Sequence, residues 1–211
     1  MPPSLLNTVR PKGALATLVG AALLCASLTG CAPLLVGGAA VGGAMVATDR
    51  RSSGVQLEDE TIELKAGQRI RSTVGERSHV NVTSYQRQVL LTGEVYNEAD
   101  KTAIEAAIGK IDGVKSVVND LGVMWPSSTS ERSRDLLLVG KVKATFVDAA
   151  GLASNAFTVV AERGVVYLMG RVTEEEATRA IHLARAVPGV VKVVRLVDVI
   201  TPEQLKSIKG R

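Results

Sequence analysis

The alternation of apolar and polar residues along the chain predicts helices and strands in a fixed order. Apolar residues recur every four positions at Ile62, Ala66, Ile70 and Val74, which is the spacing of one helix face. Residues 80–85 and 89–95 alternate as strands do, with a short turn at Gln86-Arg87 between them. Asn97 is placed to cap a second helix, and 114–123 predicts a third strand. The predicted order is αββαβ, with regular structure beginning near Glu58.

The same pattern occurs a second time. Residues 90–95 align with 167–172 at an offset of 77, which matches Gly93 with Gly170. The two matched glycines lie in strand patterns, where glycine marks a bulge or a close backbone approach. Each copy has about 65 residues, which is small for a self-sufficient core. Packing of the two copies on each other would complete that core. The fold class is therefore α+β, each copy being a three-stranded mixed sheet with two helices on one face.

The N-terminal part of the chain has the character of a targeting signal. Arg10 and Lys12 precede an apolar run at 13–28, which is shorter than a membrane-spanning helix requires. The run ends in Leu28-Thr29-Gly30-Cys31, which resembles a bacterial lipobox. A lipobox makes Cys31 the lipidated N-terminus, carrying diacylglycerol and an N-acyl chain, with no other cofactor. An uncleaved membrane anchor is the alternative, but Pro33 and repeated glycines from Gly37 on disfavour a lipid-facing helix.

The composition limits the partners of the mature protein. The chain has 25 Lys and Arg against 21 Asp and Glu, and it lacks the concentrated basic footprint that nucleic-acid binding needs. Its two cysteines are Cys25, inside the signal, and Cys31, the lipid site. An internal disulfide in the mature protein is therefore excluded, and packing alone holds the core.

These observations divide the chain into six segments. In order they are a signal peptide (1–30), a lipidated Gly-rich tether (31–57), the first copy (58–124), a linker (125–132), the second copy (133–200) and a basic tail (201–211). Within the tail, Thr201 can cap a short helix, with Pro202 at its first position and Gln204 completing a capping box.

The whole pattern resembles tandem BON domains. The motifs that carry the resemblance are the lipobox, residues 81–85 (NVTSY) and residues 166–174 (VYLMGRVTE). The chain resembles the dual-BON outer-membrane lipoproteins, the division- and outer-membrane-stress-associated lipid-binding protein family. The resemblance implies a non-enzymatic protein that is anchored in the outer membrane and faces the periplasm. Ala32, in place of Asp, agrees with sorting to that membrane. It further implies binding of anionic phospholipid such as phosphatidylglycerol, and support of envelope integrity.

In that family the first helix of the second domain contacts the membrane. Here the helix is predicted from about Ser133 to Val147, with a core stripe that leaves two leucines over. The candidate lipid-binding residues are Leu136, Leu137, Lys141 and Lys143. The same leucines could instead pack against the first copy, with the lysines only solvating the helix. The family carries an aromatic residue at the position of Leu137. The leucine in its place would weaken insertion of the helix into the membrane interface.

Catalytic and metal-binding motifs are missing from the sequence. It has two histidines, His79 and His182, without paired spacing, and its glycines form no phosphate loop. The sequence thus predicts neither catalytic residues nor a metal site. A periplasmic adaptor that meets an envelope protein through the Leu136 and Leu137 surface is the alternative function.

Overall fold

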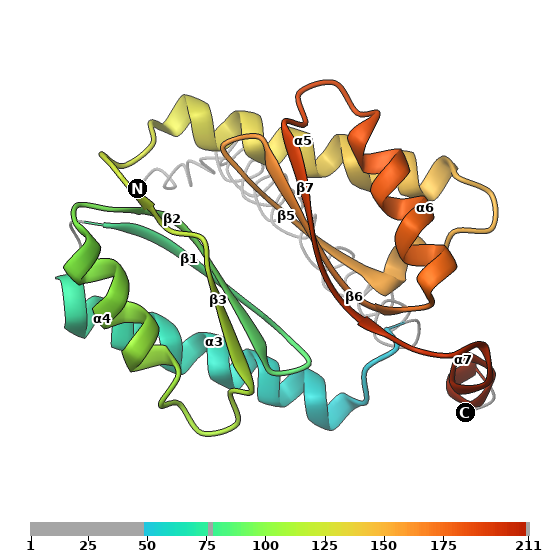
Figure 1. Cartoon of the computed structure of the whole chain (residues 1–211), viewed down its shortest axis with the longest axis horizontal. Coiled ribbons are helices and arrows are strands. Elements are labelled where there is room, and N and C mark those ends of the chain that lie inside the picture. Colours follow the sequence, from blue (N-terminus) through green and yellow to red (C-terminus); the bar gives the residue numbers. More distant parts are fainter. Residues whose placement is uncertain (1–48, 76–77, 210–211) are drawn as a thin grey trace, which may run out of the picture. The chain divides into compact units, whose positions relative to one another are not determined.

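The structure is a computed structural model that describes residues 49–75 and 78–209 (Figure 1). The signal peptide, Cys31 and most of the tether lie outside the described residues. The first copy contains α3 (Ser53–Val74), β1 (His79–Tyr85), β2 (Gln88–Val95), α4 (Glu98–Ile108), β3 (Ser116–Asn119) and β4 (Gly122–Val123). The second copy contains α5 (Thr129–Asp148), a 3₁₀ turn (Ser154–Ala156), β5 (Phe157–Glu162), β6 (Val165–Val172), α6 (Glu174–Arg185) and β7 (Lys192–Val199). The tail forms α7 (Pro202–Lys209), capped by Thr201 and Gln204 as predicted.

Each copy forms a mixed sheet around a central strand. The central strand, β2 or β6, pairs antiparallel with the strand before it and parallel with the strand after the second helix. The α+β prediction is therefore confirmed. One detail was wrong, because the third strand of the first copy is not continuous over 114–123. It is divided into β3 and β4, and both pieces pair with β2.

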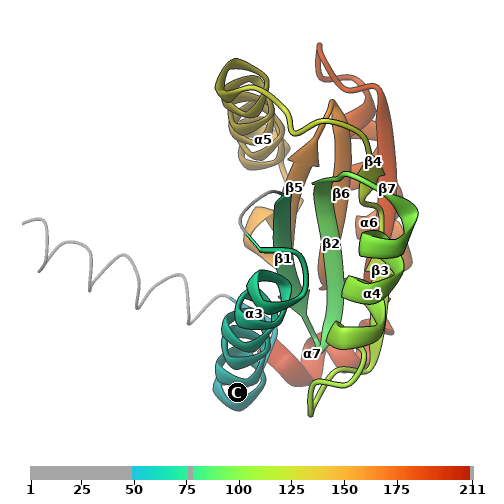
Figure 2. The same cartoon turned by 90° about the vertical axis from the view of Figure 1, so that its left-hand side faces the viewer.

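The helices cover one face of each sheet. In the first copy the predicted stripe of α3 is buried together with Val89, Leu91 and Val95 of β2. In the second copy α5 contributes Leu138, Val142 and Phe146 to an equivalent core. Figure 2 views the chain from the side on which α3 and α4 lie.

The other faces of the two sheets share a third hydrophobic cluster. Tyr85 and Leu90 of the first copy meet Tyr167 and Met169 of the second, and all four side chains are at most 4% exposed. Polar contacts surround this cluster: the Tyr167 hydroxyl donates to Asp120, and the Arg171 amide donates to the Tyr85 hydroxyl at 3.1 Å. The two copies therefore complete each other's core.

Both first helices begin earlier than the apolar pattern predicts. The helix α3 starts at Ser53 instead of near Glu58, and α5 starts at Thr129 instead of near Ser133. The reason is capping. Ser52 accepts a hydrogen bond from the Val55 amide, and Ser128 forms a capping box with Glu131. These early turns carry few apolar residues, so the hydrophobic period did not indicate them.

The early start of α3 changes the role of its acidic residues. Asp59 lies beyond the first turn of α3, is 2% exposed and faces the hairpin. Its carboxylate accepts the amides of Gln86 and Arg87, both of which have positive φ. Asp135 of α5 binds the turn amides of the second copy in the same way. A helix carboxylate thus fixes both hairpin turns, whose geometry is otherwise costly for residues other than glycine.

Arg50 fastens the end of the tether to the second copy. Its guanidinium forms two hydrogen bonds of 2.7 Å with the Glu176 carboxylate and one of 3.0 Å with the Arg171 carbonyl oxygen. Both side chains are largely buried, at 5% and 15% exposed. Such a bidentate pair fixes geometry as well as charge. It therefore determines where the tether leaves the folded part.

The matched glycines allow a close backbone approach, as the sequence predicts. A Cβ atom on Gly170 would lie 2.4 Å from the Ala156 carbonyl oxygen, and one on Gly93 would lie 2.1 Å from that of His79.

We expect Gly170→Ala to lower the free energy of unfolding by about 1–3 kcal/mol, because the backbone must move to make room for the Cβ atom. Gly67→Ala in α3, where nothing lies within 4 Å, should raise it by about 0.5–1 kcal/mol. Urea denaturation would measure the free energy of unfolding of both variants. Equal effects of the two substitutions would contradict the close backbone approach at Gly170.

The Arg50–Glu176 pair predicts a pH-dependent contribution to stability. Its hydrogen bonds lower the pKa of Glu176 from 4.5 to about 2. Because the folded-state pKa is depressed, the contribution is complete above the ordinary pKa and is lost as the pH falls toward 2. We expect Glu176→Gln to cost about 1.5–3 kcal/mol at pH 7. The difference from the wild type should vanish in acid.

Glu175→Gln, on an exposed neighbour of Glu176, is the matched control and should change stability little at any pH. Denaturation of both variants between pH 2.5 and 7 tests the prediction. A cost of Glu176→Gln that is independent of pH would contradict it.

Candidate functional site

The outward face of α5 carries the candidate residues. Leu138, Val142 and Phe146 hold the opposite face in the core, which fixes the rotation of the helix. Leu136 and Leu137 are 73% and 66% exposed. They therefore do not pack against the first copy, and that alternative was wrong. Lys141 and Lys143 are exposed as well.

The four candidate residues divide between two sides of this outward face. At 100° per residue, Leu137 and Lys141 lie on one side, together with Arg134. Leu136 and Lys143 lie on the other side. The small residues Gly140 and Ala144 occupy the middle, and a Cβ on Gly140 would meet nothing within 4 Å. The outward face thus has small residues at its centre, a leucine on each side of them, and cationic side chains beyond the leucines.

A groove of about 620 Å³ runs along the Leu137 side of α5. The end of the first copy contributes Met124 to it, and the linker contributes Trp125, Pro126 and Ser127. The helix α5 contributes Arg134, Leu137 and Lys141 among others. The hairpin turn Arg163-Gly164 and the α6–β7 loop at Pro188-Gly189 close the remaining sides. The groove therefore combines apolar walls with charged groups of both signs, the acidic ones being Glu94, Glu131 and Asp135.

Trp125 is the largest apolar group beside this groove. It is 79% exposed, and its ring meets Tyr96 edge to face at a centroid distance of 5.1 Å. Met124 beside it is 47% exposed. The sequence assigned both positions to a domain end and a linker, and so missed them as site residues. The sequence offered one indication, which is that Trp125 is an aromatic residue outside any periodic apolar pattern.

Exposed leucines are not confined to α5. Leu57 and Leu64 of α3 are 66% and 72% exposed. What distinguishes α5 is the groove beside it together with its own cationic side chains. The groove with Trp125 and the four cations at Arg132, Arg134, Lys141 and Lys143 belong to this helix.

Glu94 lies at the floor of the groove and connects the two copies. Its carboxylate is fully buried and accepts from Arg163 Nη1 at 2.8 Å, from the Ser127 amide and hydroxyl at 3.1 Å, and from His79. Burial raises its pKa, but the Ser127 amide and the Arg163 and His79 side chains outweigh that effect and lower the pKa below its usual value. Glu94 is therefore a charged anchor for the linker.

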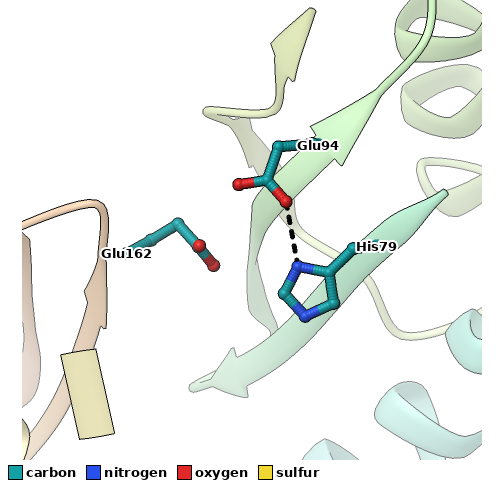
Figure 3. Close-up of side chains that lie close together, drawn as sticks. All are labelled: His79, Glu94 and Glu162. Carbon is teal, nitrogen blue, oxygen red and sulfur yellow. Dashed lines mark hydrogen bonds and ion pairs between the residues drawn. The ribbon is translucent and has the colours of Figure 1, made fainter. Parts of the chain in front are cut away.

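A second buried carboxylate lies beside it. Glu162 of β5, His79 and Glu94 have donor atoms within 4.8 Å of one another (Figure 3). Burial, and then the nearby Glu94 charge, raise the pKa of Glu162 above its usual value. The sequence predicted no metal site, because these residues are up to 83 positions apart and show no ligand spacing.

Comparison with known proteins agrees with this architecture. The BON domain model matches residues 58–124 and 134–201. The chain is 36% identical to the outer membrane lipoprotein DolP of Haemophilus influenzae over 192 residues, which covers 90% of this chain and 97% of that protein. It is 27% identical to a 21 kDa hemolysin of Actinobacillus pleuropneumoniae over 71% of this chain and 78% of that one.

Among solved structures, the chain is similar to CdsD, a structural protein of the type III secretion system of Chlamydia trachomatis. That likeness has a TM-score of 0.29 at 15% identity, and it covers 68% of this chain and 97% of that one. Within residues 49–75 and 78–209, no helix has the length and apolar character to cross a bilayer. The two domain matches and the extensive identity are decisive: the chain belongs to the BON-domain family, as an outer-membrane lipoprotein with two BON domains.

Proposed function

We propose that this outer-membrane lipoprotein is a non-enzymatic protein that docks on anionic phospholipid through α5 and the adjoining linker. Cys31 carries the lipid anchor, and the folded part faces the periplasm. The observation that carries the proposal is the combination of exposed Leu136, Leu137 and Trp125 with four cationic side chains around one helix. A helix with apolar groups at its centre and cations on its flanks suits the interface of an anionic bilayer.

The expected energies describe a weak contact. Each Lys or Arg near an anionic surface contributes about 1 kcal/mol. Each leucine adds less than the roughly 1.5–3 kcal/mol of full burial, because its side chain only enters the headgroup region. Weak docking is sufficient once the protein is already anchored, since the second contact is then intramolecular.

The length of the tether allows both contacts on one bilayer. Residues 32–49 connect Cys31 to the Arg50 clamp and reach at most about 60 Å when extended. The clamp contacts Arg171 near the end of β6, and the groove includes Gly164 just before β6 begins. This eight-residue strand is about 26 Å long. The reach of the tether therefore exceeds the separation that docking of α5 has to bridge.

An adaptor function is the second candidate. The same groove and leucines could receive an apolar segment of an envelope protein. Exposed Leu57 and Leu64 on α3 favour some protein contact outside α5. The two functions differ in their response to lipid charge and salt, because screening weakens exposed charge contacts but not apolar ones.

In the lipid-docking function, the protein supports outer-membrane integrity through the contact of α5 with the bilayer, in addition to its lipid anchor.

Charge and apolar variants of α5 test the docking. The soluble fragment 49–211 contains all three buried clusters and is the protein to use. We expect it to bind liposomes that contain phosphatidylglycerol in a salt-sensitive manner, and not neutral ones. The double variant Lys141→Glu/Lys143→Glu should lose at least about 2 kcal/mol of binding free energy, which is about 30-fold in affinity for these liposomes. Leu137→Glu should reduce binding as well, because it puts an anionic group at the interface.

The equivalent helix of the first domain provides matched controls. Leu64→Glu and Lys65→Glu/Arg69→Glu alter exposed residues of α3 and should leave liposome binding within about twofold of the wild type, since α3 lacks the groove. Co-sedimentation at two salt concentrations measures all variants. Equal losses from α3 and α5 variants, or binding that ignores lipid charge, would contradict docking through α5.

Trp125 offers an independent spectroscopic prediction. It is the single tryptophan of the chain, so the intrinsic fluorescence of the fragment reports on this position alone. Because an interfacial tryptophan leaves water for the headgroup region, we expect a blue shift on adding anionic liposomes and none with neutral ones. Leu137→Glu should diminish the shift in parallel with binding. Binding without any spectral change would exclude Trp125 from the contact.

A further inference from the structure

Three side chains of types that can bind metal ions converge from both domains around Glu94, which lines the groove. His79 comes from β1 and Glu94 from β2 of the first domain, while Glu162 ends β5 of the second. Figure 3 shows the three side chains pointing toward one another. The His79 Nδ1 atom lies 3.0 Å from Glu94 Oε2, and one donor atom of each residue lies within 4.8 Å of the others.

The cluster places two buried carboxyl groups beside one guanidinium group. The side chains of Glu94 and Glu162 are 0% and 4% exposed, respectively. Arg163 pairs closely with Glu94 at 2.8 Å but lies 4.0 Å from Glu162. The nearer partner of Glu162 is the neutral side-chain amide of Asn81 at 3.2 Å. Two buried carboxylates therefore share one guanidinium, and buried charges need a close ionic partner or a metal ion.

The donor set selects a particular kind of cation. One imidazole and two carboxylates are ligands that Zn²⁺ accepts, with a fourth position left for water. Mg²⁺ and Ca²⁺ prefer oxygen ligands alone. In a tetrahedral site with bonds of about 2.0–2.1 Å, neighbouring donor atoms are about 3.3 Å apart. The 3.0 Å between His79 and Glu94 needs little adjustment, whereas Glu162 has to approach.

The surroundings also supply the supporting hydrogen bonds that metal ligands need. Asn81 donates to Glu162 Oε2, and Arg163 donates to Glu94 Oε1, on the oxygen away from His79. The Ser127 amide and hydroxyl donate to Glu94 Oε2, the oxygen that faces His79, from the linker side. Such outer contacts orient ligating carboxylates and strengthen metal binding.

We propose that His79, Glu94 and Glu162 bind one Zn²⁺ ion that bridges the two BON domains. The ion joins β1 and β2 to β5 beside the Arg163 contact. Because Glu94 also holds Ser127, the ion stiffens the linker that carries Trp125 and the N-terminus of α5. The site is independent of lipid docking, and its direct test contains no lipid.

Calorimetric titration of metal-free fragment 49–211, after chelation with EDTA and dialysis, tests the site. We expect one Zn²⁺ per chain and a higher melting temperature with Zn²⁺, but no comparable effect of Mg²⁺ or Ca²⁺. His79→Ala and Glu162→Gln should each weaken Zn²⁺ binding at least tenfold. Glu162→Gln is nearly isosteric and can still accept from Asn81, so it keeps the test valid if His79→Ala misfolds.

His182→Ala is the matched control. His182 is the second of two histidines, and it lies exposed on α6 away from the cluster. Its replacement should leave affinity, stoichiometry and thermal shift unchanged. Absence of Zn²⁺ binding by the wild type would overturn the proposal. So would equal binding by the folded Glu162→Gln variant, or loss of binding in His182→Ala, and neither result would bear on binding to liposomes.

Discussion

The packing of one sheet against the other is the constraint on which the described structure depends. Helices cover one face of each sheet, and a domain of this size cannot leave the second face in water. Leu90 and Met169 point from the central strands into the shared layer, with Tyr85 and Tyr167 beside them. The central strands are consequently buried over nearly their whole length. Neither domain has a complete core without the other.

Polar groups at the rim of this layer determine the relative position of the domains. Apolar packing is non-directional, whereas hydrogen bonds of buried tyrosines and carboxylates have defined geometry. Tyr167 reaches Asp120, and Arg163 reaches both Glu94 and the Gly93 carbonyl oxygen. Loss of one partner would leave a buried polar group unsatisfied. The groove beside α5 is formed by both domains, so its shape depends on these contacts.

The sequence predicted those features that repeat at a regular period. The four-residue stripe of α3, the offset between Gly93 and Gly170 and the turn at Gln86-Arg87 are all confirmed. Features formed by residues far apart in the chain could not be predicted from the sequence. Asp59 fixes a hairpin 27 residues away, and no periodic pattern in the sequence connects the two. The groove needs the linker, α5, the β5–β6 turn and the α6–β7 loop together, so the sequence indicated the helix but not Trp125.

The difference between the two domains follows from what precedes their first helices. In the first domain α3 follows Arg50 and Arg51, whose guanidinium groups are occupied by Glu176, Asp49 and Asp59. A segment held by ion pairs offers no apolar surface. In the second domain α5 follows Met124, Trp125 and Pro126, which remain exposed or half-buried beside the helix. The same αββαβ unit therefore serves for attachment of the tether in one copy and has an open amphipathic groove in the other, because the segments that precede the first helices differ.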